Sequence, residues 1–171
     1  GSDTQAYGNP LRLRRALDAG VRVVVAHCAS LGEDIDLDKG EHGPQRSSFE
    51  LFLRLNGEAR AKGLLYGDIS AITQRNRKPA LIRSLLERED LHERLLHGSD
   101  YPLPGILPLT SLSKLVKAGL LPAGAVGDLE ILRQHNPLLF DFSLKRLLAW
   151  QGHSFSPAVF QTRRIFAASQ A

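Results

Sequence analysis

Three short apolar runs, separated by segments with helical patterns, constrain the fold of this chain more than any other feature. They cover residues 21–27, 64–71 and 95–99. The first is rich in β-branched valine and almost continuously apolar, which is typical of a strand buried on both faces of a parallel sheet. Parallel strands need a crossover connection, and each intervening segment is long enough to contain a helix. The sequence therefore predicts an α/β fold with parallel strands.

Helix start signals occur between and after these strands. Asn9-Pro10 and Asn136-Pro137 each combine an N-cap residue with proline at the first helical position. Ser47 and Glu50 have the spacing of a capping box. With the apolar spacing that follows these signals, we expect helices over residues 10–19, 47–62, 79–88, 110–118, 122–134 and 137–149.

The length of the chain fits one domain but not a closed barrel. Its 171 residues predict a single domain, 1–171, with a peripheral terminal helix opened by Ser156-Pro157 within residues 150–171. A closed (β/α)8 barrel needs roughly 250 residues. Three strands are also few for a stable sheet, so we expect the remaining strands to come from elsewhere.

Composition describes a soluble protein of a reducing compartment. Hydrophobic residues make up 43% and charged residues 23% of the chain. No apolar run approaches the ~20 residues of a membrane span, and no targeting segment is visible. Cys28 is the one cysteine, so an internal disulfide is excluded. We expect a cytoplasmic protein with no membrane partner.

The excess of basic residues raises the question of whether the chain binds nucleic acid. The formal net charge is +4, but the basic residues are scattered, and Arg12 and Arg15 recur one helical turn apart, as solvated positions do. No aromatic platform is interleaved with them. We therefore expect no nucleic-acid partner and keep a non-catalytic basic binding module as the alternative class of function.

Ionisable side chains stand at the carboxyl ends of the predicted strands. His27 ends the first, and Asp100 follows the third, just before Tyr101-Pro102. Parallel α/β folds place their chemistry at this edge, so His27 and Asp100 are the candidate functional residues. Asp100 has an alternative role as the cap of the following turn. Asp68 either accepts a hydrogen bond from a ligand residue and so orients it, or caps the next helix. Both interpretations remain open.

Other reactive residue types have structural interpretations. Cys28 is interpreted as a buried structural thiol rather than a nucleophile. His42 is interpreted as an exposed loop histidine, and His97 as structural because alternation places it on the face opposite Asp100. Residues 28–46, rich in glycine and acid, are expected to form a long solvated lid.

Three motifs, taken together, resemble one known family. They are Val24-Val25-Ala26-His27, Gly98-Ser-Asp100-Tyr-Pro102 and Asn136-Pro137-Leu-Leu-Phe140. They are similar to the sixth strand, the eighth strand and the opening of the closing helix in the amidohydrolase superfamily. The branch in question contains aminocarboxymuconate-semialdehyde decarboxylase and related lactone hydrolases. The resemblance covers roughly residues 8–148.

The resemblance implies a fold and a chemistry. The chain would be the last three strands and helices of a TIM-like (β/α)8 barrel. It would be part of an enzyme that hydrolyses a small organic acid, lactone or amide through a metal-activated water, with decarboxylation as the alternative. The metal would be a divalent ion, zinc in particular. Asp100 would bind the metal or accept a proton from its water, and His27 would bind the metal or contact the substrate.

Two departures from the family pattern matter. The first-strand His-x-His motif and a fifth-strand histidine are absent from this chain. A catalytic zinc needs about three protein ligands and an open position, which His27 and Asp100 alone do not supply. We therefore expect a missing amino-terminal half of the barrel, or a partner chain that supplies it, and an isolated 171-residue piece without activity.

Overall fold

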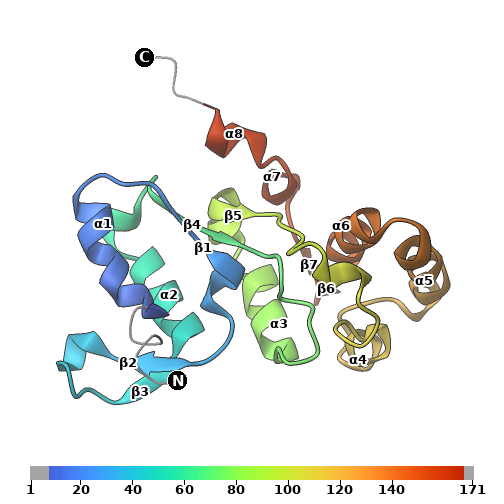
Figure 1. The fold of residues 1–171 in the computed structure, drawn as a ribbon, viewed down its shortest axis with the longest axis horizontal. Helices are drawn as coiled ribbons and strands as arrows, with labels where there is room; N and C mark the ends of the chain where they lie inside the picture. The colour runs from blue at the N-terminus through green and yellow to red at the C-terminus, as the bar shows by residue number, and fades with distance from the viewer. Residues whose placement is uncertain (1–7, 168–171) are drawn as a thin grey trace. The chain divides into compact units, whose positions relative to one another are not determined.

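The computed structural model of the protein describes residues 8–167. These residues divide into two compact units, of which the first ends at Asp68 and the second begins at Ile69. Helices and short strands follow one another along the chain (Figure 1). The predicted mixed α/β class is therefore confirmed.

The first unit combines short helices with two pairs of strands. Its helices are α1 (Arg14–Asp18) and α2 (Ser48–Asn56), with 3-10 turns η2 (Pro10–Leu13), η3 (Ala26–Ala29), η4 (Leu37–Lys39) and η5 (Ala59–Ala61). Its strands are β1 (Val23–Val25), β2 (Glu33–Ile35), β3 (Gln45–Ser47) and β4 (Leu65–Asp68).

Strands β1 and β4 pair in parallel, as the valine-rich run predicted. Val23 is opposite Leu65 and Val25 is opposite Gly67. Leu65 is fully buried, and Phe52 from α2 is buried in the same unit. A β carbon added at Gly67 would lie 2.7 Å from Cys28 Sγ and 2.7 Å from Phe52 Cζ. Only glycine allows β4 to pack this closely against both side chains.

Both strands end earlier than the sequence predicted. β1 stops at Val25, and the chain turns at once through η3, so His27 lies just beyond the strand rather than at its last position. β4 similarly stops at Asp68. The prediction that His27 ends the first strand is therefore wrong by two residues.

The expected solvated lid is a short hairpin instead. β2 and β3 pair antiparallel within residues 33–47, and Asp36 between them is only 2% exposed. Asn9 donates from Nδ2 to the carbonyl oxygen of Ile35 at 2.8 Å, which ties the hairpin to the start of η2. The prediction of an irregular lid was wrong because Asp34, Asp36 and Asp38 find partners within the unit. Most of residues 28–46 are exposed, as the prediction of a solvated segment required.

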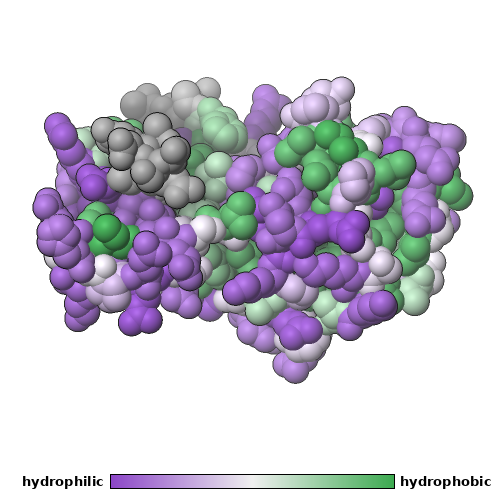
Figure 2. Space-filling view, turned by 60° about the horizontal axis from the view of Figure 1, so that its bottom comes forward, coloured by the Kyte–Doolittle hydropathy of each residue, from purple (hydrophilic) through white to green (hydrophobic). Residues whose placement is uncertain are grey.

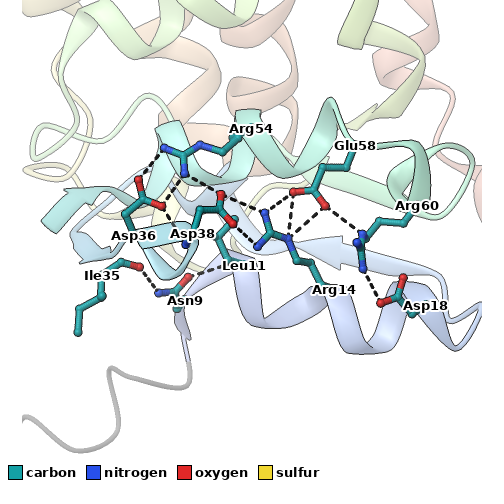
Figure 3. Close-up of polar contacts among 10 residues, drawn as sticks. All are labelled: Asn9, Leu11, Arg14, Asp18, Ile35, Asp36, Asp38, Arg54, Glu58 and Arg60. Atoms are coloured by element: carbon teal, nitrogen blue, oxygen red, sulfur yellow. Dashed lines mark hydrogen bonds and ion pairs between the residues drawn. The ribbon is translucent and has the colours of Figure 1, made fainter. Parts of the chain in front are cut away.

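Arginine side chains hold this hairpin through a network of ion pairs (Figure 3). Arg54 of α2 donates to Asp36 at 2.6 Å and 3.0 Å and to Asp38 at 2.9 Å. Arg14 of α1 donates to Asp38 at 2.6 Å and also pairs with Glu58. Asp38 thus connects the two helices, which explains why a loop rich in acid is ordered.

The start of α2 differs in detail from the predicted capping box. Ser47 is the N-cap residue, but its side chain makes no capping hydrogen bond. The neighbouring Ser48 donates from its hydroxyl to Asp34 at 2.6 Å. Ser47 is instead the last residue of β3, opposite Glu33.

The second unit is mainly helical. Its helices are α3 (Pro79–Glu87), α4 (Leu112–Lys117), α5 (Val126–His135), α6 (Pro137–Leu147), α7 (Pro157–Phe160) and α8 (Arg163–Phe166). Its 3-10 turns are η6 (Glu89–Arg94), η7 (Leu103–Gly105) and η8 (Ala123–Ala125), and its strands are β5 (Leu95–Leu96), β6 (Ala149–Trp150) and β7 (His153–Ser154).

The predicted third strand is present but short. β5 covers two buried leucines, and the N–H of Ile69, the first residue of this unit, donates to the carbonyl oxygen of Leu96 at 2.9 Å. Gly98 and Asp100 lie beyond the strand. The predicted helices over 79–88, 110–118, 122–134 and 137–149 correspond to α3, α4, α5 and α6.

The expected terminal helix is two one-turn helices, α7 and α8. Val159 of α7 is fully buried, and its carbonyl oxygen accepts the N–H of His97 at 2.8 Å. The β6–β7 hairpin, which the sequence did not predict, precedes them. Residues 168–171 of the expected segment lie outside the described residues.

Hydrophobic residues also reach the surface. Figure 2 shows them in separate patches among hydrophilic residues. In the first unit, Val21 and Val24 are 50% and 38% exposed, and in the second unit α6 exposes Leu138 and Phe142. Within residues 8–167, no helix has both the length and the hydropathy to cross a membrane.

Candidate functional site

His27 and Asp68 meet at the carboxyl ends of the paired strands β1 and β4. Oδ1 of Asp68 accepts the backbone N–H of His27 at 3.0 Å and lies 3.6 Å from the ring atom Nδ1. Both side chains are partly exposed, at 32% for His27 and 22% for Asp68. One carboxylate therefore fixes the backbone of His27 and faces one edge of its ring.

The chain around His27 has an unusual backbone. His27, Cys28 and Ala29 have φ values of 55°, 51° and 50°, in the left-handed region that non-glycine residues rarely adopt. The bond from His27 to Asp68 holds this turn, and the N–H of Ser30 donates to the carbonyl oxygen of His27 at 2.9 Å. Strained backbone of this kind persists where the surroundings over-determine it and is concentrated at functional sites.

Cys28 is part of this turn but is not available for chemistry. Its side chain is fully buried, and its S–H donates to the carbonyl oxygen of Asp68 at 3.1 Å. Burial, together with the charge of Asp68, raises the pKa of the Cys28 thiol well above its ordinary value. The thiol stays protonated, in agreement with its interpretation as structural.

Asp100 lies in the second unit, four residues beyond the end of β5. It also has a left-handed backbone, with φ 57°. Gln74 donates from Nε2 to Asp100 Oδ2 at 3.3 Å. Arg77 is 8% exposed, and burial lowers its pKa while the charge of Asp100 partly offsets this effect. The carboxylate of Asp100 thus accepts from an amide donor and interacts electrostatically with a buried cation.

A buried charged network lies beside this segment. Lys145 of α6 is fully buried, and Nζ donates to Asp141 Oδ2 at 2.7 Å and to the carbonyl oxygens of Ser70 and Gly98 at 2.8 Å and 2.7 Å. Asp141 Oδ2 also lies 3.1 Å from Nε2 of His97. A small polar cavity adjoins the network, with room for about one water molecule. It is lined by Ser70, Thr73, Gln74, Ser99, Leu103, Pro104, Thr110 and Asp141.

The structure places the two predicted site residues in different units. His27 is in the first with Asp68, and Asp100 is in the second with Gln74. Of the two interpretations of Asp68, the orienting one is supported by its contact with His27. His42 is exposed, as predicted, and His97 packs between Phe142 and Phe160, also in agreement with a structural role.

Sequence reasoning missed Gln74, Asp141 and Lys145. Gln74 lies in a loop and carries no motif. Asp141 and Lys145 did have a signal, because they are four residues apart on the face of α6 that also carries Phe140 and Leu144. Charged residues at core positions of a helix are rarely buried without partners, so this spacing predicts a buried pair.

The donor set fits a divalent metal in kind but not in number. Imidazole and carboxylate are ligands that zinc uses. Among residues 8–167, however, no group of three or more His, Cys, Asp or Glu side chains is gathered closely enough to hold a metal ion. His27 and Asp100 would need further ligands to complete a catalytic zinc centre.

Comparisons with protein-family models, with curated proteins and with solved structures found no match to this chain.

Proposed function

We propose that this chain is the carboxyl-terminal part of a metal-dependent hydrolase of the amidohydrolase type, acting on a small organic acid, lactone or amide. The observation that carries the proposal is the His27–Asp68 pair at the carboxyl ends of two parallel strands. Asp100 supports it from beyond the third strand. This edge is where parallel α/β folds assemble their active sites.

The surroundings of His27 suit an imidazole that binds a metal or contacts a substrate. A carboxylate 3.6 Å from Nδ1 favours a ring orientation in which Nε2 would face a ligand. His27 would therefore bind the metal or contact the substrate through Nε2. Asp68 is the positioning residue of this pair, because its carboxylate accepts the backbone N–H of His27 and its carbonyl oxygen accepts from Cys28 in the same turn.

Asp100 would supply the carboxylate. Gln74 donates to Oδ2, which leaves Oδ1 as the oxygen with which Asp100 would hold a cation or accept a proton. A divalent ion such as zinc supplies the activated water of this chemistry, since a bound water has a pKa lowered to about 7. His27 and Asp100 are each proposed as a ligand of such an ion, and the remaining ligands would come from outside this chain.

The position of β1 at the edge of its sheet supports the proposal that further strands are required. β1 is at one end of its sheet, and Val21 and Val24 are substantially exposed. Strands of parallel sheets are normally covered on both faces and paired on both sides. A missing amino-terminal half of the barrel, or a partner chain that supplies it, would cover this edge and complete the TIM-like barrel.

The alternative of a basic binding module is less well supported. Several arginines that contribute to the positive charge are paired with acids of their own unit, which offsets their charge locally. The pairs are Arg14 with Asp38 and Glu58, Arg54 with Asp36 and Asp38, Arg60 with Asp18 and Glu58, Arg88 with Asp90, and Arg164 with Glu93.

Hydrolysis of a panel of small lactones, esters and amides by the complete protein tests the proposal. We expect turnover that a chelator abolishes and zinc restores. His27→Asn should lower turnover at least tenfold, since general acid–base and ligand residues contribute this much or more. The control is His42→Asn, in the exposed part of the hairpin, which should retain activity. Hydrolysis that survives both the chelator and His27→Asn would contradict the proposal.

A further inference from the structure

Lys145 is the most deeply buried cation of the second unit, with a fully buried side chain. Burying an ammonium group costs several kcal/mol unless its donors are satisfied. Nζ has three donors, and three acceptors lie within 2.8 Å of it: Asp141 Oδ2 and the carbonyl oxygens of Ser70 and Gly98. The arrangement is that of a structural clamp, because an ammonium engaged on three sides and closed to solvent cannot act as a nucleophile.

The two carbonyl groups belong to the segments that determine the surroundings of Asp100. Gly98 is two residues before Asp100, and Ser70 is four residues before Gln74, which donates to Asp100. Lys145 thus bridges the segment that carries the carboxylate and the segment that carries its amide partner. A change in the separation of Ser70 and Gly98 would change the contact between Gln74 and Asp100.

The clamp is itself fixed from α6 and α7. Asp141, one turn before Lys145 on α6, accepts from Lys145 and contacts Nε2 of His97. The backbone N–H of His97 donates to Val159 of α7. Because His97 directly precedes Gly98, the start of the Asp100 segment is held on both sides.

We propose that Lys145 is a positioning residue for Asp100: its ammonium group sets the separation of the Ser70 and Gly98 segments and thereby the contact between Gln74 and Asp100. The consequence for metal binding rests on the proposed function, whereas the positioning itself does not. The two can therefore be tested separately.

The first experiment measures the Gln74–Asp100 contact by NMR in the complete protein. Asp100→Asn should shift the side-chain NH2 signals of Gln74, because it removes the carboxylate that accepts from Gln74. In a Lys145→Met background, Asp100→Asn should no longer cause this shift, while the amide protection of α3 is retained. Lys117→Met, at an exposed lysine on α4, is the control and should leave the shift unchanged.

A full shift in a folded Lys145→Met variant would overturn the proposal. If Lys145→Met does not fold, Lys145→Gln is measured instead. The glutamine amide still donates hydrogen bonds but reaches fewer of the three acceptors. We then expect a reduced shift, and an unchanged shift would equally overturn the proposal.

The second experiment measures the zinc dissociation constant of the complete protein for Lys145→Met with and without Asp100→Asn. Loss of an orienting contact typically weakens metal binding about tenfold or more. We expect this weakening when Asp100 is present and none in the Asp100→Asn background. If Lys145→Met weakens zinc binding equally with and without Asp100→Asn, this result would contradict the proposal that Lys145 acts by positioning Asp100. If Asp100→Asn alone leaves zinc binding unchanged, the proposed function fails, and the NMR experiment still decides the role of Lys145.

Discussion

Oδ1 of Asp68 accepts the backbone N–H of His27 at 3.0 Å and lies 3.6 Å from Nδ1 of the same residue. A single carboxylate at the end of β4 therefore holds the left-handed turn after β1 and lies beside the imidazole that this turn carries. The same turn buries Cys28 against β4. Its geometry has consequences for stability that can be measured without knowledge of the substrate.

The first prediction concerns the left-handed turn. Ala29→Gly should stabilise the protein by about 0.5–1 kcal/mol, because glycine removes the cost of a positive φ at this position. Ala26→Gly is the control: Ala26 lies in the same turn but outside the left-handed run, and the change should destabilise by about 0.5–1 kcal/mol. Urea unfolding measures both, and destabilisation by Ala29→Gly would contradict the described backbone.

Gly67 gives the second prediction. Gly67→Ala would place a β carbon 2.7 Å from atoms of Cys28 and Phe52, and overpacking of this kind costs about 1–3 kcal/mol. Gly127→Ala in α5 meets no atom within 4 Å and should be neutral or slightly stabilising. Thermal unfolding of the two variants side by side distinguishes a packing requirement from a general effect of replacing glycine.

The third prediction concerns the buried Lys145–Asp141 pair. Asp141→Leu alone leaves the ammonium without its charged partner in the core and should cost about 3–5 kcal/mol. The double variant Asp141→Leu/Lys145→Met should be less destabilised than the sum of the two single variants, because no unpaired charge remains. Additive losses in denaturant unfolding would show that the pair is not coupled.

The fourth prediction is a pH dependence of the hairpin. Hydrogen bonds from Arg14 and then from Arg54 lower the pKa of Asp38 from 3.8 to about 2. A carboxyl whose pKa is lower in the folded state contributes stability that is fully present above pH 3.8 and is lost as the pH falls through about 2. The melting temperature should therefore decrease across this window, and less steeply in Arg54→Gln.

High salt provides the check on that prediction. Asp38 and both arginines are partly exposed, so 1 M salt should screen the ion pairs and reduce the pH dependence. An identical decrease between pH 4 and pH 2 in the parent and in Arg54→Gln would contradict the assignment of this effect to the network.

The sequence predicted the elements whose signals are local. Asn136 accepts the N–H of Leu139 and so caps α6 as expected, and the valine run forms a strand parallel to β4. It overestimated the first strand because His27 and Cys28 adopt positive φ, which no periodic pattern of non-glycine residues reveals. The apolar pattern of the sequence therefore continues beyond the last residue of the strand.

The candidate site was predictable only in part. His27 and Asp100 followed from their positions after apolar runs, and Asp68 from its place on the second run. The hairpin over 33–47 was missed because its stability comes from Arg14 and Arg54, which are distant in sequence. Contacts of this range depend on the tertiary fold and leave no local pattern.

The zinc content of the complete protein, determined by elemental analysis with and without Asp100→Asn, tests the central claim most directly. The substitution keeps the size of the side chain and removes the charge that the cation requires. We expect one zinc per chain in the parent, a large loss in Asp100→Asn, and full retention in the control Asp128→Asn, at an exposed carboxylate on α5. Full zinc content and intact activity in Asp100→Asn would contradict the assignment of this chain to a metal-dependent hydrolase.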